Sequence, residues 1–138
     1  MKGALDSTII VSALAGGDGY QEACSDLVYG GDVFVYNHAF AETFSTITGS
    51  RLGFRISPSR AAELICDVVP QVTVGIISID EIVAALTEAE SRGVRGGAIY
   101  DFLHLMVAKQ RGIARVFTLN AEHFLAFHRP GNPEIVHP

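Results

Sequence analysis

The sequence predicts an α/β fold, a three-layer α/β/α sandwich in which helices cover both faces of a central parallel sheet. Short apolar and β-branched runs alternate along the chain with segments of helical periodicity, which is typical of parallel strands joined by helices. The 138 residues suit one domain, 1–138, because no linker, repeat or low-complexity segment divides them. A hydrophobic content of 49% against 18% charged residues supplies a core and excludes a disordered tail.

Five short segments have the composition of strands. Residues 33–36 are β-branched and aromatic, and residues 115–119 have the apolar character of a buried strand. A short apolar run ends at Asp6, and the segment near the C-terminus is expected as a last edge strand. The predicted strands are 3–5, 33–36, 72–77, 115–119 and 134–136.

Helices fill the intervals between these strands, and glycine or proline marks most of their ends. Ser57 followed by Pro58 predicts a helix start, with serine as N-cap and proline at the first helical position. The segment 98–111 is apolar on most sides and is therefore expected near the centre of the fold. The predicted helices are 9–15, 19–29, 37–48, 58–69, 79–89, 98–111 and 121–127.

The predicted localisation is cytoplasmic, outside any membrane. Asp6 interrupts the apolar run near the N-terminus, so no signal peptide is expected there. No apolar run approaches the roughly 20 residues that a membrane-spanning helix needs. Cys24 and Cys66 have no zinc-binding spacing and are expected to be reduced, partly buried thiols, which fits a reducing cytosol.

Two groups of basic residues bear on nucleic-acid binding, which the formal net charge of −5 opposes because phosphate contacts require lysine and arginine. The first group lies within ten positions, and it forms either a patch for RNA phosphates or an acidic partner, or a solvated helical face. The second lies at the C-terminus of a predicted helix, where the macrodipole favours cations, and is interpreted as structural. The groups are Arg51, Arg55 and Arg60, and Lys109, Arg111 and Arg115.

Four polar residues are predicted to lie at one rim of the sheet, where ligands of open parallel sheets bind beyond the carboxyl ends of the strands. They are Asp6, Glu42, Asp101 and Asn120. Asp6 and Asn120 have a simpler interpretation as helix caps or turn formers. Glu42 has one as a solvated helical residue, and Asp101 as an acid favoured at a helix N-terminus. Because Asp101 has apolar neighbours, its carboxylate is costly there unless it is paired or bound to metal.

Carboxylates brought together repel one another, so that several of them ionised at once require a cation. Oxygen ligands without a neighbouring cysteine favour hard ions, Mg²⁺ or Mn²⁺. Such ions activate water and stabilise a phosphoryl transition state. The pattern places no histidine in an acid/base role, so the metal is expected to generate hydroxide unaided. The predicted reaction class is hydrolysis of a phosphodiester.

Four motifs, in order, resemble those of the PIN-domain family and of its VapC-type toxins. Residues 4–8 (Ala-Leu-Asp-Ser-Thr) resemble the family's opening strand with its D-[ST] signature, and residues 37–42 resemble its second acidic motif. Residues 96–104 resemble the G-x-I-Y-D-x-x-H stretch of the toxins, and residues 118–124 resemble their last motif, T-x-[DN]-x-x-x-F. The match extends over nearly the whole chain, and the stretch that contains Tyr100-Asp101 is the most specific part.

The resemblance implies a Rossmann-like sandwich and an endoribonuclease toxin that hydrolyses RNA with Mg²⁺ or Mn²⁺. It also implies a homodimer and a cognate antitoxin that blocks the site. Asp6, Glu42 and Asp101 occupy the three acidic, metal-binding positions of the family. Asn120 stands where members often carry a fourth acid, and it would hold a water molecule or a phosphate oxygen.

The chain departs from the family pattern at two positions. Asn120 supplies no negative charge, which puts a second metal in doubt unless Glu122 substitutes for the missing acid. Thr8 stands where many members have asparagine, although its hydroxyl can hydrogen-bond a ligand or Asp6.

Three histidines lie in or after the last two motifs: one ends the third motif, one is in the fourth, and one follows it. His104 lies one helical turn after Asp101 and either orients a carboxylate, contacts RNA or serves as a structural histidine. His123 and His128 lie around the last short helix. Because no H-x-x-x-H or H-E-x-x-H spacing occurs, no zinc site is predicted. Phosphate-binding glycine loops and a G-x-S-x-G elbow are also absent, which argues against nucleotide-dependent and serine-hydrolase chemistry.

Two other functions remain as alternatives to the nuclease. The loss of the fourth acid motivates a PIN-fold module that binds RNA or protein without cutting. A phospho-acceptor receiver domain is also a small parallel α/β protein with an acidic pocket, but it needs clustered acids on the first loop and a lysine after the last strand. Asp6 stands alone and no lysine follows Lys109, which argues against a receiver.

Overall fold

Within residues 1–50, 52–53 and 55–138, which the computed structural model describes, a parallel sheet of five strands forms around the first strand. The strands are β1 (Gly3–Leu5), β2 (Val33–Tyr36), β3 (Thr73–Gly75), β4 (Arg115–Phe117) and β5 (Glu134–Val136). They pair in the order β3-β2-β1-β4-β5, and every pair is parallel. The winding therefore reverses at β1, between β2 and β4, where open α/β sheets form ligand crevices.

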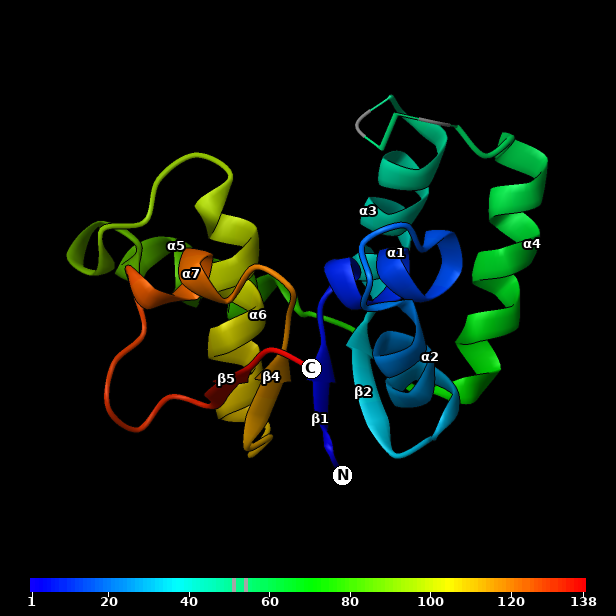
Figure 1. Ribbon diagram of the computed structural model, residues 1–138. Coiled ribbons are helices and arrows are strands. Elements are labelled where there is room, and N and C mark those ends of the chain that lie inside the picture. Colours follow the sequence, from blue (N-terminus) through cyan, green and yellow to red (C-terminus); the bar gives the residue numbers. More distant parts are fainter. Residues whose placement is uncertain (51, 54) are drawn as a thin grey trace.

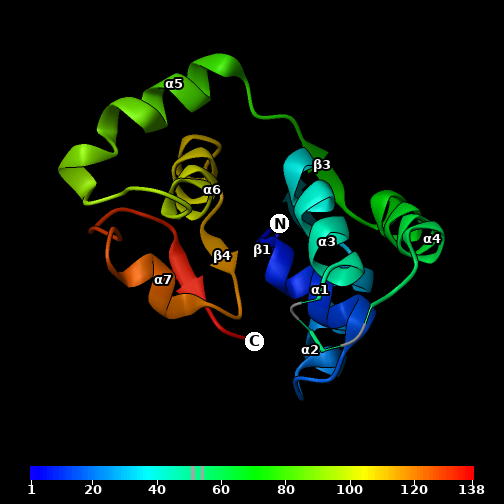
Figure 2. The ribbon, with the colours of Figure 1, turned by 90° about the horizontal axis from the view of Figure 1, so that it is seen from above.

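Helices cover both faces of this sheet, as the two ribbon views show (Figure 1, Figure 2). Helices α1 to α4 lie on one side and α5 to α7 on the other. The helices are α1 (Ser7–Ala15), α2 (Gln21–Tyr29), α3 (Asn37–Thr48), α4 (Pro58–Val68), α5 (Ile79–Glu88), α6 (Ala98–Gln110) and α7 (Ala121–Leu125). Two 3-10 turns, Val69–Gln71 and Glu90–Arg92, follow α4 and α5. The predicted three-layer sandwich is confirmed.

The alternation of side chains along the strands divides the core between the two helical layers, because successive residues of a strand point to opposite faces. The strand residues that pack with α1 to α4 are Leu5, Val33, Val35 and Phe117. Those that pack with α5 to α7 are Ala4, Phe34, Tyr36 and Val116. Helix α6 supplies the largest share of the second layer, as its apolar sequence predicts.

The predicted elements are present, and their ends differ by a few residues. Strand β3 is shorter than the predicted 72–77, and its first two residues are exposed because β3 forms an edge of the sheet. Ser57 caps α4 as expected, its side chain accepting from the amide of Arg60 at 3.2 Å. The helix gives way to a 3-10 turn at Val69, next to Pro70, which lacks the amide that would continue an α-helix.

The two cysteines differ in their environment. Cys24 is buried in the core and free, as predicted. Cys66 is also free but exposed, so the expectation of partial burial is wrong for this residue. The reason is that α4 turns Ala61, Ile65 and Val68 inward and leaves Cys66 outside this stripe. No helix in the described part of the chain combines the length and the apolar character needed to cross a bilayer.

Arg111, at the end of α6, connects that helix to the β3 side of the sheet. Its Nη2 donates to the carbonyl oxygen of Ile76 at 2.6 Å and to Oε1 of Glu81 at 2.9 Å. Its guanidinium carbon lies 5.5 Å from the ring centroid of Phe34 and 5.7 Å from that of Tyr36. These contacts support the structural interpretation of Arg111, although hydrogen bonds and aromatic stacking supply them rather than the helix macrodipole alone.

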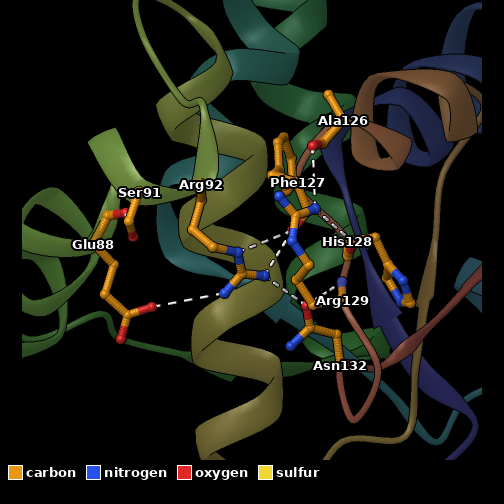
Figure 3. A network of polar contacts seen from close by, with 8 residues as sticks. All are labelled: Glu88, Ser91, Arg92, Ala126, Phe127, His128, Arg129 and Asn132. Atoms are coloured by element: carbon orange, nitrogen blue, oxygen red, sulfur yellow. Dashed lines mark hydrogen bonds and ion pairs between the residues drawn. The ribbon is translucent and has the colours of Figure 1, made fainter.

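Arg92 fastens the segment after α7 to the helical layer (Figure 3). Its Nε and Nη2 donate to the carbonyl oxygen of Phe127 at 3.2 and 2.6 Å, and Nη2 also donates to Oδ1 of Asn132 at 2.8 Å. Glu88 Oε2 lies 3.7 Å from Nη1, and the guanidinium stacks on the ring of Phe102, 5.3 Å from its centroid. The network therefore holds the C-terminal end of α7 against the rest of its layer.

We expect Arg92→Met to lower the free energy of unfolding by about 1.5–3 kcal/mol, because it removes charge-assisted hydrogen bonds and leaves a carbonyl unpaired. Urea denaturation followed by circular dichroism measures the change. Arg95→Met is the matched control, since Arg95 is exposed and its loss should cost under about 0.5 kcal/mol. Equal losses in the two variants would contradict a structural role for the Arg92 network.

Candidate functional site

The four residues predicted at the sheet rim line one cavity of about 540 Å³. Asp6 directly follows β1, and Asn120 lies three residues beyond the end of β4. Glu42 comes from α3, which follows β2, and Asp101 from the first turn of α6. Figure 2 shows α3 and α6 on opposite sides of β1, so the two helical layers contribute one carboxylate each above the central strand.

Asp6 both caps a helix and faces this cavity. Its Oδ1 accepts from the amide of Thr8 at 3.0 Å, which makes Asp6 the N-cap of α1. The side chain is 3% exposed, and burial raises the pKa of Asp6 although hydrogen bonds from Thr118 and Thr8 oppose the rise. The capping interpretation is therefore right, but it does not replace the placement of Asp6 in the cavity.

The Thr8 hydroxyl joins the ends of the two central strands. Its Oγ1 donates to Asp6 Oδ1, as expected for this position. The same Oγ1 accepts from the amide of Leu119 at 2.9 Å and lies 3.4 Å from Oγ1 of Thr118. Because Leu119 and Thr118 follow β4 and Asp6 follows β1, this threonine holds the floor of the cavity together.

Asp101 is in the first turn of α6 and has 28% of its side chain exposed. Burial raises the pKa of Asp101 to about 6, and the negative charges of Asp6 and Glu42 add to this effect while His104 and His123 oppose it. The exposed His123 places Nδ1 3.8 Å from Oδ2 of Asp101. Thus Asp101 experiences the repulsion that the sequence predicts for clustered acids.

Glu42 turns its two carboxylate oxygens to different neighbours. Oε2 accepts from the Ser7 hydroxyl at 3.5 Å. Oε1 lies 3.2 Å from Nε2 of His38 and 3.8 Å from Nε2 of His104. Burial by itself raises the pKa of Glu42, but the contacts with His104, His38 and Ser7 outweigh it and lower the pKa. Glu42 is therefore ionised at neutral pH.

Histidines lie beside the acids, so the prediction that the metal would act without a nearby histidine left these neighbours out, apart from His104 as a residue that could orient a carboxylate. His104 is 2% exposed and contacts Glu42 from α6, so it belongs to the site as well as to the core. His38 was not predicted, although its separation of four residues from Glu42 is a helical neighbour spacing that could have indicated the pair. His128 lies elsewhere and bonds the carbonyl oxygen of Pro133 at 2.8 Å through Nε2.

The further carboxylate that lines the cavity beside the three predicted acids belongs to Asp18 rather than to Glu122. Glu122 is exposed on α7 and is not among the residues that line the cavity. Asp18 does line it, and its Oδ1 accepts from Oγ of Ser12 and from the amide of Tyr20, both at 2.9 Å. Asn120 lines the cavity as well, with an exposed side chain that forms no capping hydrogen bond. Asp18 follows two glycines in a loop, where sequence patterns carry no information about spatial neighbours.

The cavity is strongly acidic. Its carboxylates face no lysine or arginine among the described lining residues, and His123 is the basic side chain there. A set of oxygen donors with this charge fits a divalent cation such as Mg²⁺ or Mn²⁺. The pKa of Asp101 is raised chiefly by burial and further by the charges of Asp6 and Glu42, and such a cation would favour the ionised form against both effects.

The first basic group gives only partial support to an RNA-binding patch. Arg51 lies outside the described residues. Arg55 is exposed. Arg60 is exposed and paired with Glu63 at 2.9 Å, which reduces its charge for phosphate binding. In the second group, Arg115 on β4 pairs with Glu134 on the neighbouring strand β5 at 3.2 Å, which supports its structural interpretation.

In the absence of divalent ions, we expect Asp101→Asn to stabilise the protein at pH 7.5 by about 1–3 kcal/mol, because the folded state disfavours the ionised Asp101 carboxyl. The pKa of this carboxyl is higher in the folded than in the unfolded chain. Between about pH 4 and pH 7, the folded wild type therefore binds more protons and loses stability relative to the variant as the pH rises. Thermal unfolding in EDTA at pH 5 and pH 7.5 measures the difference. A gap that does not shrink at pH 5 would argue against this origin.

Comparisons with known proteins agree with this fold. A family model described as PIN domain matches residues 4–129. VapC20 from Mycobacterium tuberculosis, described as a sarcin-ricin loop cleaving toxin, is similar with a TM-score of 0.71 at 16% identity, covering 94% of this chain and 98% of its own. VapBC2 from Rickettsia felis, bound to a DNA fragment from its promoter, has a TM-score of 0.68 at 16% identity. The match covers 98% of this chain and 97% of the VapBC2 chain.

A toxin–antitoxin complex from Klebsiella pneumoniae has a TM-score of 0.68 at 13% identity, covering 99% of this chain and 97% of that one. No curated protein sequence matches significantly. At identities this low, the likeness to the solved structures shows a shared fold.

Proposed function

Because this chain belongs to the PIN-domain family, we propose that it is an endoribonuclease toxin that hydrolyses RNA phosphodiester bonds with Mg²⁺ or Mn²⁺. The observation that carries the proposal is the meeting of Asp6, Glu42 and Asp101 in one cavity without a balancing lysine or arginine among its described lining residues. Paired or clustered carboxylates in a cleft with a raised pKa are typical of functional sites. The description of the similar VapC20 as a sarcin-ricin loop cleaving toxin supports the choice of RNA as substrate.

Residues in and around the cavity have distinct proposed roles in RNA hydrolysis. Asp6, Glu42 and Asp101 would hold the cation, which would lower the pKa of bound water and neutralise charge on the phosphate. Thr8 keeps Asp6 in place through its hydroxyl, and Ser7 positions Glu42 in the same way. The side-chain amide of Asn120 would donate to a phosphate oxygen or hold a water molecule at the rim.

A cognate antitoxin and a second copy of the chain are the proposed protein partners, in the cytoplasm. The similar VapBC2 and Klebsiella structures are toxin–antitoxin assemblies, which supports the antitoxin. An exposed apolar face on α5 supports the need for a protein partner, since patches of this kind are commonly covered in assemblies. It includes Ile79, Val83 and Leu86, which are 70%, 52% and 55% exposed.

We expect the purified protein to cleave structured RNA in the presence of Mg²⁺ or Mn²⁺. Cleavage should cease when EDTA removes the divalent ion. Asp101→Asn should reduce the rate at least 100-fold, because it removes a charged ligand from the cation. Glu122→Gln, an exposed acid on α7 outside the cavity, should cleave at the wild-type rate. If correctly folded Asp101→Asn cuts RNA as fast as wild type, the site is misassigned.

A second candidate function is a PIN-fold module that binds RNA or protein without cutting it. The observation that favours it is the neutral Asn120 in the cavity, where an additional acid would strengthen metal binding. Calorimetric titration with Mn²⁺ separates the two functions. A nuclease should bind at least one Mn²⁺ per chain below millimolar concentration, and Asp6→Asn should remove that binding, whereas a chain that shows no binding at millimolar Mn²⁺ is the non-catalytic module.

A further inference from the structure

His38, Glu42 and His104 form a cluster on the side of Glu42 that faces away from Ser7. This cluster contains imidazole nitrogens, whereas the acidic cavity offers oxygen donors. His38 and Glu42 lie four residues apart on α3, and His104 faces them from α6. One ligand atom from each residue lies within 4.8 Å of the other two. Two imidazoles and one carboxylate thus point to a common centre between the two helical layers.

Buried polar atoms without partners gather at this same place. Among the described residues, Nε2 of His38 and Oε1 of Glu42, which lie 3.2 Å apart, are buried and form no hydrogen bond. On His104 the unpaired atom is Nδ1, and the other ring nitrogen, Nε2, lies 3.8 Å from Oε1 of Glu42. A buried polar atom that stays unpaired costs free energy, and most such atoms in folded proteins are satisfied by protein, water or an ion. A cation held between His38 and Glu42 would satisfy both of their unpaired atoms.

Aromatic packing accounts for the arrangement of the rings but leaves these atoms unsatisfied. The rings of His38 and His104 meet edge to face with centroids 4.5 Å apart, and the Tyr36 ring lies 5.1 Å from that of His104. This packing orients the imidazoles and limits their rotation. It gives no partner to the nitrogen and oxygen atoms at the centre of the cluster.

We propose that His38, Glu42 and His104 form a site for Zn²⁺ or a similar borderline transition-metal ion, separate from the hard-cation site of the acidic cavity. Imidazole nitrogen with one carboxylate oxygen is a donor set that proteins use for zinc, with three protein ligands and one open position. The site goes beyond the proposed function and shares only Glu42 with it.

The present geometry is close to what zinc requires. Two ligands held about 2.0–2.1 Å from a tetrahedral ion are about 3.4 Å apart. Oε1 of Glu42 lies 3.2 Å from Nε2 of His38 and 3.8 Å from Nε2 of His104, and one ligand atom from each residue lies within 4.8 Å of the other two, so side-chain rotations would have to bring the histidine nitrogens closer to the ion.

Glu42 connects the two sites through its two oxygens. Oε1 faces the histidines, and Oε2 faces Ser7, which lines the acidic cavity. A carboxylate can ligate one cation through each oxygen. The arrangement therefore separates a cavity of oxygen donors, suited to Mg²⁺ or Mn²⁺, from a half-buried nitrogen-containing site suited to Zn²⁺.

Calorimetric titration of the full chain with Zn²⁺ in excess Mg²⁺ tests this site without reference to RNA cleavage. We expect one Zn²⁺ per chain in the wild type and at least a tenfold weaker affinity in His38→Ala and in His104→Gln. His123→Ala, which removes the histidine beside Asp101, is the matched control and should bind Zn²⁺ like the wild type. Co²⁺ should give the visible absorption of a tetrahedral nitrogen-containing site, and this absorption should disappear in His38→Ala.

Crossed titrations distinguish this site from the hard-cation site. His38→Ala should lose Zn²⁺ but keep Mn²⁺, Asp101→Asn should lose Mn²⁺ but keep Zn²⁺, and Glu42→Gln should weaken both. A wild type without Zn²⁺ binding, or binding unchanged in His38→Ala, overturns the zinc site whatever the RNA assay gives. Retained Zn²⁺ binding with no Mn²⁺ binding overturns the nuclease and leaves the zinc site standing. Because His104 is buried, circular dichroism checks the folding of its variant, and the partly exposed His38 decides the outcome if that variant unfolds.

Discussion

The mutual repulsion of carboxyl groups held in a half-buried cavity is the constraint to which the rest of this molecule is adapted. Asp6 is fixed at the end of the central strand and almost fully buried. Glu42 and Asp101 approach it from the two opposite helical layers. Burial, with the negative charges of Asp6 and Glu42 adding to it, raises the pKa of Asp101. A packed core brings these charges together, and in the absence of a cation it does so at a cost in free energy.

The polypeptide offsets this cost with polar contacts that fix each acid. Thr8 joins Asp6 to the residues after β4, and Ser7 and the two histidines stabilise the ionised form of Glu42. Farther from the cavity, Arg92 holds the segment after α7, the helix that begins directly after Asn120. Rigid elements and buried hydrogen bonds thus set the positions of side chains that lie on short loops and helix ends.

Glu42 is the residue at which two kinds of donor chemistry meet. Toward the cavity, its neighbours are hydroxyl and carboxylate oxygens, which favour hard cations. Toward the protein interior, its neighbours are the imidazoles of His38 and His104, which favour borderline ions. The two kinds of donor lie side by side because α3 and α6 pack on opposite faces of the sheet, near the rim where β1 and β2 end.

The sequence alone predicted the parallel α/β fold, because hydrophobic periodicity marks strands and helices. It also predicted that Asp6, Glu42 and Asp101 lie at one rim of the sheet, because parallel strands present their carboxyl ends there. It further predicted the capping role of Ser57, and it offered Asp6, besides a ligand, as a partner of the Thr8 hydroxyl, because both contacts are local in the chain.

Only the tertiary structure placed Asp18 in the cavity, excluded Glu122 from it and brought His104 to His38 and Glu42. These contacts join residues from loops or from helices on different layers, and no periodicity records such distances. The packing of α3 and α6 on opposite faces of the sheet decided the meeting of His104 with His38 and Glu42, because burial and crossing geometry depend on the whole core rather than on any one segment.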